Sequence, residues 1–145
     1  MSTRSLFSVL CFSLLDEHRP ATATAAAAMP HLSLTHNVAA APPAADVDVA
    51  KALSKAVAEA LGKPEQYVAV EVSRKVLLFG GSPKPAATAL LSSIGKIDLE
   101  HNTLVSKAVA VALDGLAIPA DRVYIRYLDV ARENWGWNGK TFANQ

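Results

Sequence analysis

The sequence predicts an α/β (α+β) fold, a tandem βαβ repeat in which a four-stranded mixed sheet carries two helices on one face. Two related stretches support this prediction, since residues 54–72 and 106–128 both begin Ser-Lys-Ala-Val-Ala and both continue through glycine and proline. Each stretch changes from a helical to a strand-like apolar period. Strand-like sequence at residues 30–38 and 87–97 precedes the two helices.

The first unit is expected to contain a strand within residues 30–38, a helix, and a strand at residues 68–72. Gly62 is a candidate left-handed residue that closes the helix, and Pro64 prevents its continuation. Apolar residues at three- and four-residue steps predict one buried helix face. They are Val47, Ala50, Leu53, Val57 and Leu61.

The second unit is expected to repeat this order, with a strand within residues 87–97, a helix, and a strand at residues 123–127. Gly115 and Pro119 occupy the places of the glycine and proline that follow the first helix. The predicted buried face of this helix consists of Leu104, Ala108, Val111 and Ala112. A short extra piece, KVLLFGG at residues 75–81, separates the units.

A helix that joins two strands of one sheet favours parallel pairing with a right-handed crossover. Both helices then lie on the same face, and the second face of the sheet is left uncovered. Alternation places polar and apolar side chains together on this open face, and we expect oligomerisation through it. Its members are Ala69, Glu71, Ser73, Tyr124, Arg126 and Leu128.

Composition excludes several classes of function. The chain has 145 residues, 51% hydrophobic and 19% charged, which is globular composition. A net charge of +1 without a basic block does not indicate nucleic-acid binding. Cys11 is the only cysteine, so no intrachain disulfide can form, and no Cys/His cluster has zinc spacing. No apolar run reaches membrane-spanning length.

Residues 1–28 are predicted to be an extension outside the fold, and residues 29–145 the domain. Arg4, a short apolar stretch and an alanine-rich tract follow the order of a signal peptide. A transit peptide is an alternative, which the acidic Asp16 and Glu17 disfavour, and a third interpretation makes Met29 the working start. We expect a cytoplasmic protein, with secretion or an organelle as the alternative if residues 1–28 are a targeting peptide.

From Met29 onward the sequence resembles the macrophage migration inhibitory factor and D-dopachrome tautomerase family of the tautomerase superfamily, and its last motif is closest to plant-type members. The resemblance runs over residues 29–143 and implies a homotrimer of βαβ-repeat subunits. It is carried by Met29-Pro30, GKPEQYVAV from Gly62, FGGS from Phe79, SSIGKI from Ser92, DRVYIRYLDV from Asp121 and NWGWNGKTFA from Asn134.

The resemblance implies that Pro30 is a general base in a keto–enol tautomerase that needs no cofactor. In the family, a free N-terminal proline moves a proton between carbon and oxygen of the substrate. An α-amino group titrates closer to neutrality than lysine, and apolar burial or a nearby cation favours its neutral form. An internal proline is a tertiary amide without a basic lone pair. Pro30 is therefore expected to act only as the first residue of the mature chain.

The same resemblance implies the remaining pocket. Lys63 is expected to bind the substrate carboxylate and the main chain at Ile94 to contact substrate. Tyr124 is expected from a neighbouring subunit, and Arg126, which departs from the asparagine of animal members, adds a second carboxylate contact or narrows the site. Trp137 and Phe142 form an apolar wall for an aromatic ring. Trp135 and Tyr67 are expected at the pocket rim.

The expected activity is tautomerisation of small aromatic α-keto acids of the phenylpyruvate type, by a trimer with no metal and no cofactor. The alternative is a cytokine-like binding trimer, with a receptor protein as partner and a vestigial pocket. Animal members can carry Cys-x-x-Cys before the SIGK motif, but Ala86 and Ala89 stand at those places here. Thiol–disulfide chemistry through that motif is excluded, because it requires a thiolate.

Overall fold

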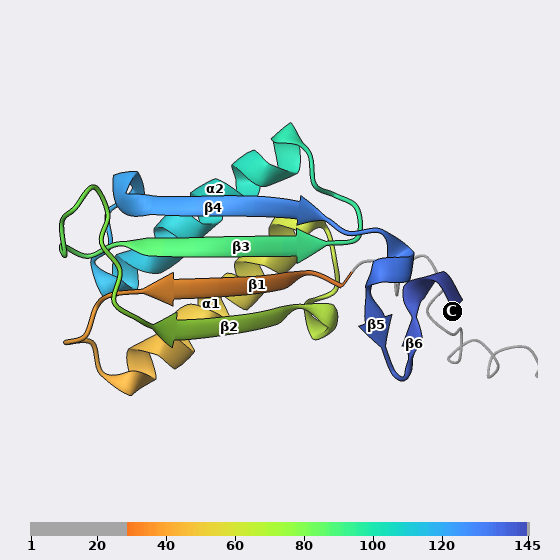
Figure 1. Cartoon of the computed structure of the whole chain (residues 1–145), viewed down its shortest axis with the longest axis horizontal. Coiled ribbons are helices and arrows are strands. Elements are labelled where there is room, and N and C mark those ends of the chain that lie inside the picture. Colours follow the sequence, from red (N-terminus) through yellow and green to blue (C-terminus); the bar gives the residue numbers. More distant parts are fainter. Residues whose placement is uncertain (1–28, 145) are drawn as a thin grey trace, which may run out of the picture.

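The structure, a computed structural model, describes residues 29–144. The predicted N-terminal extension, residues 1–28, lies outside the described residues. The described chain forms a four-stranded sheet, a two-stranded hairpin and two long helices (Figure 1). In chain order the elements are β1 (His31–His36), α1 (Pro43–Leu61), β2 (Ala69–Arg74), β3 (Ala87–Ser93), α2 (Leu99–Leu113), β4 (Val123–Asp129), β5 (Gly136–Trp137) and β6 (Lys140–Thr141).

The sheet confirms the predicted tandem βαβ arrangement. Its strand order is β2-β1-β3-β4, with β1 parallel to β2 and β3 parallel to β4. The two units meet at the antiparallel pair β1–β3, where His31 lies opposite Ser92. Consequently β1 begins at the same end of the sheet at which β3 and β4 finish (Figure 1).

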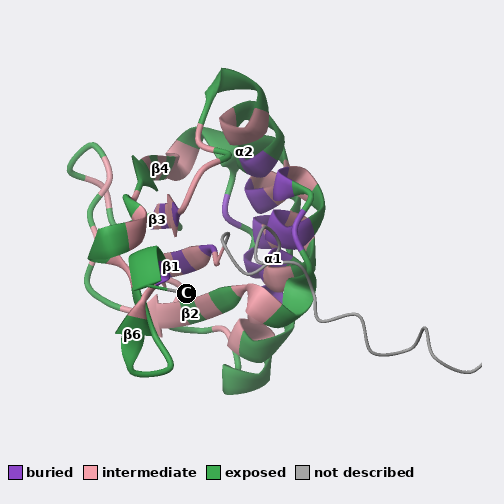
Figure 2. Cartoon of the chain, turned by 90° about the vertical axis from the view of Figure 1, so that its right-hand side faces the viewer, coloured by how far each residue is buried: buried purple, intermediate pink, exposed green. Residues whose placement is uncertain are grey.

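The core lies between the sheet and the two helices, and buried residues occupy this layer (Figure 2). Leu32 and Leu34 of β1 and Leu91 of β3 are fully buried there. Strands β2 and β4 add partly buried side chains at alternate positions, as their sequence period predicts. These are Val70, Val72, Val123, Ile125 and Tyr127.

The predicted helix faces are correct in part for both helices. Val47 is 53% exposed, and Val49 takes its place on the face that contains Leu53, Val57 and Leu61. In α2 the buried residues are Val105, Val109 and Leu113. Leu104 and Val111, expected inside, are 45% and 71% exposed. Ala112 of the predicted set does pack against the core. The helix is apolar on most sides, so its pattern alone does not select Val105, Val109 and Leu113.

The ends of the two helices differ. Gly62 closes α1 in the left-handed region, with φ 61°, as predicted. Gly115 is not left-handed, so that prediction is wrong. A 3-10 turn, Asp114–Leu116, continues α2 past Gly115, and the left-handed residue is Ala117, with φ 52°. This extra turn buries Leu116 and brings Ile118 into the core.

A buried polar network fixes the connection from β1 to α1. His36 is fully buried, and its Nε2 lies 3.1 Å from Oδ1 of Asp46. Because its Nδ1 accepts the N–H of Val38, Nε2 carries the proton that Asp46 accepts. Arg74 donates to the other carboxylate oxygen of Asp46 at 2.7 Å and holds the pKa of that carboxyl below its usual range.

The face of the sheet away from the helices is uncovered in the single chain, as predicted (Figure 2). Its side chains interact laterally. Nε2 of His31 lies 3.8 Å from Oε1 of Glu71, and the hydroxyl oxygens of Thr35 and Ser73 are 3.1 Å apart. The exposed residues of this open face are Ala69, Glu71, Tyr124, Arg126 and Leu128.

Candidate active site

Pro30 lies immediately before β1 and is buried. Its carbonyl accepts the N–H of Ala69 at 3.0 Å, which ties it to the start of β2. The antiparallel register of β1 and β3 pairs His31 with Ser92. Continued by one residue, this register places Pro30 opposite Ser93. The candidate base therefore lies at the end of the sheet where β3 finishes.

Lys63 reaches the same end of the sheet from α1. The left-handed Gly62 reverses the chain after the helix, and the N–H of Lys63 donates to the carbonyl of Ala58 at 2.9 Å. Its Nζ then donates to the Ser93 hydroxyl at 2.6 Å. Lys63 is only 8% exposed, so the ammonium is held inside the protein next to the strand residue that faces Pro30.

The Lys63 ammonium has further acceptors in the chain that leaves β3. Nζ lies 3.2 Å from the carbonyl oxygen of Ile94 and 3.4 Å from that of Gly95. An ammonium has three N–H donors, and three oxygen atoms surround this one. The two carbonyl contacts are the longer ones, so an anion at Nζ would displace them more readily than the Ser93 contact.

Burial and, to a smaller extent, the charge of Lys96 lower the pKa of the Lys63 ammonium from 10.5 to about 8, against the opposing effect of Asp129. Removal from water disfavours the charged form of a lysine. With a pKa of about 8, the group still carries a positive charge at neutral pH. It can therefore bind an anion, and it disfavours protonation of any amine beside it.

The loop after β3 has an unusual backbone. Gly95 and Lys96 are both left-handed, with φ 71° and 62°. The N–H of Gly95 donates to Oδ1 of Asp129 at 2.9 Å, which fixes the turn to the end of β4. Ile94 is the first residue after β3, which ends at Ser93, and it contributes its carbonyl to Lys63.

The hairpin β5–β6 lies beyond this end of the sheet (Figure 1). Its turn residues Asn138 and Gly139 have φ 51° and 74°, which fits a type I′ turn. The rings of Trp137 and Phe142 are nearly parallel, with centroids 6.2 Å apart. Phe142 is 1% exposed and Trp137 is 43% exposed. We call this pair the aromatic wall.

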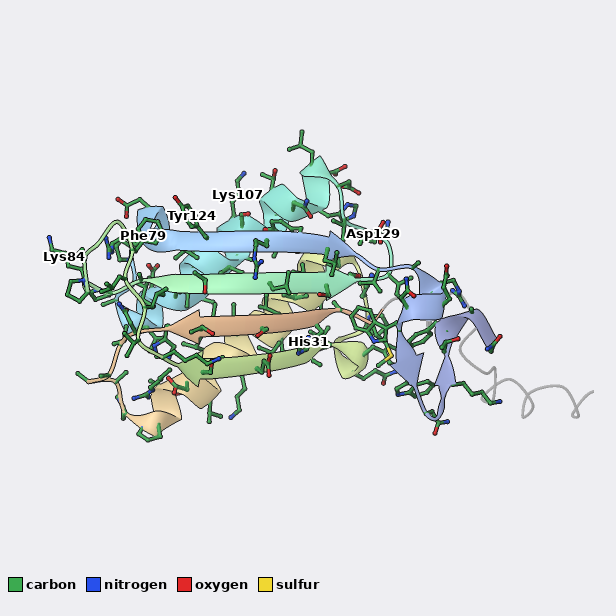
Figure 3. All side chains as sticks on the ribbon, in the orientation of Figure 1. His31, Phe79, Lys84, Lys107, Tyr124 and Asp129 are labelled. Atoms are coloured by element: carbon green, nitrogen blue, oxygen red, sulfur yellow. The ribbon has the colours of Figure 1, made fainter. Side chains whose placement is uncertain are left out.

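Two predicted site residues lie elsewhere in the single chain. Tyr124 lies at the opposite end of the sheet from His31 and Asp129, against Phe79 (Figure 3). The ring centroids of Tyr124 and Phe79 are 4.6 Å apart. Arg126 is paired with Leu90 in the middle of β4 and shares a surface hollow with Tyr124. One subunit alone therefore does not bring these side chains to Pro30.

The rim residues are placed at the ends of short turns. Tyr67 is half-buried in the 3-10 turn Glu65–Tyr67, which follows Lys63 after one residue. Trp135 is half-buried, and its carbonyl accepts the N–H of Phe142 at 3.0 Å. In the described part of the chain, no group of three or more His, Cys, Asp or Glu side chains is placed to hold a metal ion. No helix there is long and apolar enough to cross a membrane.

The structure adds two residues that the sequence did not single out. Ser93 is fully buried and supplies the shortest contact of Lys63. Its alternation with Leu91 signalled an inward position, but not a polar partner. Arg132 donates to the carbonyl of Phe142, a contact that no spacing in the sequence indicates. The hairpin could have been predicted from the sequence, because Asn138-Gly139 is a typical pair for a two-residue hairpin turn.

Comparisons with known proteins agree with this arrangement. A family model described as macrophage migration inhibitory factor matches residues 29–143. Macrophage migration inhibitory factor of Meriones unguiculatus is 46% identical over 93 residues, which cover 63% of this chain and 81% of that protein. A solved homologue from Prochlorococcus marinus is 35% identical, with a TM-score of 0.72, and covers 77% of this chain and 98% of that one. The corresponding Toxoplasma gondii structure is 32% identical, with a TM-score of 0.69, over 77% and 98% of the two chains.

Proposed function

Since the chain belongs to the macrophage migration inhibitory factor family, we propose that it is a cofactor-independent keto–enol tautomerase of small aromatic α-keto acids. Pro30 is the general base, and the working form is a homotrimer. The observation that carries this proposal is the buried Lys63 ammonium, which is held 2.6 Å from the hydroxyl of Ser93 beside the start of β1. A retained cation at that position suits a carboxylate substrate and a neutral amine.

The chemistry transfers a proton without any net change in oxidation state. The neutral Pro30 amine removes a proton from the carbon next to the keto group, and the electrons of that carbon–hydrogen bond form the carbon–carbon double bond. The carbonyl π electrons move to the keto oxygen, which takes the proton from the protonated Pro30 and becomes the enol hydroxyl, so the neutral amine is restored. The reverse sequence regenerates the keto form. A base works best when its pKa lies near the operating pH, which a cation beside the amine promotes.

Substrate binding uses the two ends of an aromatic α-keto acid. The carboxylate takes the place of the longer carbonyl contacts of Lys63, at 3.2 and 3.4 Å, while the Ser93 contact is kept. The ring packs against the aromatic wall. The main chain at Ile94 contacts the substrate between these two groups, and Tyr67 and Trp135 line the rim.

Trimer assembly completes the site in this proposal. Tyr124 is 67% exposed on the open face and lies at the opposite end of the sheet from His31, the residue after Pro30. A neighbouring subunit can supply it, and Arg126 then either adds a second contact to the carboxylate or narrows the entrance. The uncovered sheet face carries further exposed apolar area at Leu128, which assembly would bury.

The proposal requires that Pro30 be the first residue of the mature chain. Translation from Met29 followed by removal of that methionine leaves a secondary amine at Pro30. We place the domain at residues 29–145 and the protein in the cytoplasm on this basis. If residues 1–28 direct the chain elsewhere, cleavage after Ala28 alone would leave Met29 attached and the amine blocked.

The test compares three proteins with phenylpyruvate as substrate. The first is started at Met29 and trimmed to Pro30, the second carries Pro30→Gly in the same form, and the third keeps residues 1–28. The trimmed protein should tautomerise phenylpyruvate, while the other two fold but lose most of the rate. A Pro30→Gly or extended protein with the full rate would show that the Pro30 amine is not the base. Intact mass from native cells then establishes which form exists.

A receptor-binding trimer is the second candidate. The segment ahead of Pro30 favours it, because a retained extension would keep the proline nitrogen in an amide and leave the pocket without a base. Tautomerase activity and receptor binding measured on the same native material separate the two functions.

A further inference from the structure

The aromatic wall is attached to the sheet through a short connection. Trp137 belongs to β5, and Phe142 begins the 3-10 turn that follows β6, so the wall is built from the hairpin and this turn rather than from the main sheet. Residues 130–135 join the hairpin to β4. The position of the wall relative to Lys63 therefore depends on how this connection is held.

Arg132 holds the main chain of Phe142. Its Nε and Nη2 both donate to the carbonyl oxygen of Phe142, at 3.1 and 2.7 Å. The N–H of the same residue donates to the carbonyl of Trp135 at 3.0 Å. Both main-chain polar groups of Phe142 are thus engaged, and its carbonyl accepts from two N–H donors of a planar, permanently charged group.

The chain segment that leads from β4 to Arg132 is anchored at the Lys63 end of the site. Arg132 begins the 3-10 turn Arg132–Asn134, which follows β4 closely. The N–H of Val130 donates to the carbonyl of Ser93 at 2.9 Å. Ser93 in turn accepts the Lys63 ammonium through its hydroxyl. Ser93 therefore anchors both the Lys63 ammonium and the chain segment that leads to the aromatic wall.

We infer that Arg132 is a positioning residue, which fixes the aromatic wall at a set distance from the Lys63 ammonium and so creates the preference for carboxylates that carry a ring. The inference rests on the proposed function for its choice of ligand. Arg132 acts through Phe142 and does not itself contact substrate. A short aliphatic carboxylate needs only Lys63, whereas a ring-bearing one needs both ends of the site.

The experiment measures binding without turnover, so it does not depend on Pro30 acting as a base. The chain started at Met29 is titrated with 3-phenylpropanoate, which has a ring, and with butanoate, which has none. Arg132→Ala should weaken 3-phenylpropanoate binding about tenfold, as expected for loss of charge-assisted hydrogen bonds. Butanoate binding should stay within about twofold. Arg132→Lys, which keeps a charged donor, should restore part of the loss.

Glu133→Ala is the matched control, because Glu133 is an exposed neighbour in the same turn. Tryptophan fluorescence gives a second readout, since the chain contains only two tryptophans, Trp135 and Trp137, and both lie in or beside the hairpin. Acrylamide quenching should increase in Arg132→Ala, with an unchanged far-UV spectrum, and should not change in Glu133→Ala.

The inference would be overturned if Arg132→Ala weakened the binding of 3-phenylpropanoate and butanoate equally, or if it left 3-phenylpropanoate binding unchanged. So would increased quenching without a change in the preference for the ring, because the wall would then move without affecting recognition. Failure of the tautomerase proposal has a different signature. In that case phenylpyruvate turnover is absent or survives Pro30→Gly, independently of how 3-phenylpropanoate and butanoate bind.

Discussion

Lys63 shows how the surroundings of one residue set its chemistry. Lysine at a helix end is ordinarily a solvated cation, but here the left-handed Gly62 returns the chain to the sheet and buries the side chain. The polar atoms that receive it come from the end of β3. The family resemblance of the motif identifies the lysine. The three hydrogen-bond acceptors of its ammonium, on Ser93, Ile94 and Gly95, come together only when α1 and β3 pack against each other.

The first prediction concerns the pH dependence of substrate binding. Because burial lowers the pKa of Lys63 to about 8, the ammonium is charged below that pH and loses its charge as the pH rises through it. The KM for phenylpyruvate should therefore be lowest below pH 8 and should increase above it. Steady-state kinetics between about pH 6 and pH 10 measure this profile.

Lys96 supplies a directed variant for the same profile. Its charge lowers the pKa of Lys63, so Lys96→Asn should move the rise in KM to higher pH. Asparagine tolerates the left-handed backbone at this position, where φ is 62°. Lys75→Asn, at the exposed residue after β2, should leave the midpoint unchanged. A KM that stays flat well above pH 8 in the unmodified protein would contradict the role of Lys63.

The second prediction concerns Ser93. Ser93→Ala removes the 2.6 Å contact and leaves a buried ammonium with one acceptor fewer. The free energy of unfolding should fall by about 1–2 kcal/mol, the usual cost of an unsatisfied buried donor. Urea denaturation measures the change. Ser92→Ala is the control, since the adjacent serine lies on the open face and should alter stability by less than about 0.5 kcal/mol.

At the scale of elements, strands were easier to predict than helix faces. Apolar residues alternate regularly along the strands of the main sheet, and the residues expected to point inward do so. Because side chains alternate between the two faces, the apolar set of each strand can lie on one face only. Helix α2 is apolar on most sides, and of its expected inward residues Leu104 and Val111 face outward, whereas Ala112 packs against the core. Packing against α1 and the sheet, rather than any local pattern, selects Val105, Val109 and Leu113.

The third prediction concerns the two left-handed residues that end the helical segments. In Gly62→Ala a new Cβ would meet no atom within 4 Å, so its cost is the backbone conformation alone. That variant should lose about 1 kcal/mol of unfolding free energy. Ala117→Gly should gain about 0.5–1 kcal/mol, since it relieves the same conformation at φ 52°.

Thermal or urea unfolding of the two variants gives these differences with opposite signs. Gly115→Ala is the matched control, because Gly115 is not left-handed and its added Cβ would lie 3.9 Å from the side chain of Val49. Alanine should be tolerated there. A loss at Gly115→Ala as large as at Gly62→Ala would mean that local packing, and not backbone handedness, determines the cost.

At the scale of the whole molecule, the repeated βαβ unit predicts the parallel pairs, but the central antiparallel pairing of β1 with β3 has no local signal. That pairing places Pro30 opposite the end of β3, and so it determines which ends of the two units form the site. It also sends Tyr124 to the far end of the sheet. Long-range pairing of this kind follows from the joint burial of both helices.

The last prediction uses this separation to test whether Tyr124 completes a neighbouring site. In a cyclic trimer, a site built from Pro30 of one subunit and Tyr124 of the next can be rebuilt from two defective subunits. Subunits with Pro30→Gly and subunits with Tyr124→Ala, each impaired alone, are unfolded together and refolded at equal concentration. Every mixed trimer then contains one intact site, so about a quarter of the unmodified rate should return.

Mixing Pro30→Gly with Lys63→Ala provides the control, because Pro30 and Lys63 come from the same subunit. No mixed trimer of that pair has an intact site, so its rate should remain at the level of the separate variants. Equal recovery in both mixtures would indicate simple additivity, and no recovery with Tyr124→Ala would place Tyr124 outside the neighbour's site. Recovery in the first mixture alone requires that the far end of one sheet meet the proline end of another, which is the assembly that the open face and the distance between Tyr124 and Pro30 jointly favour.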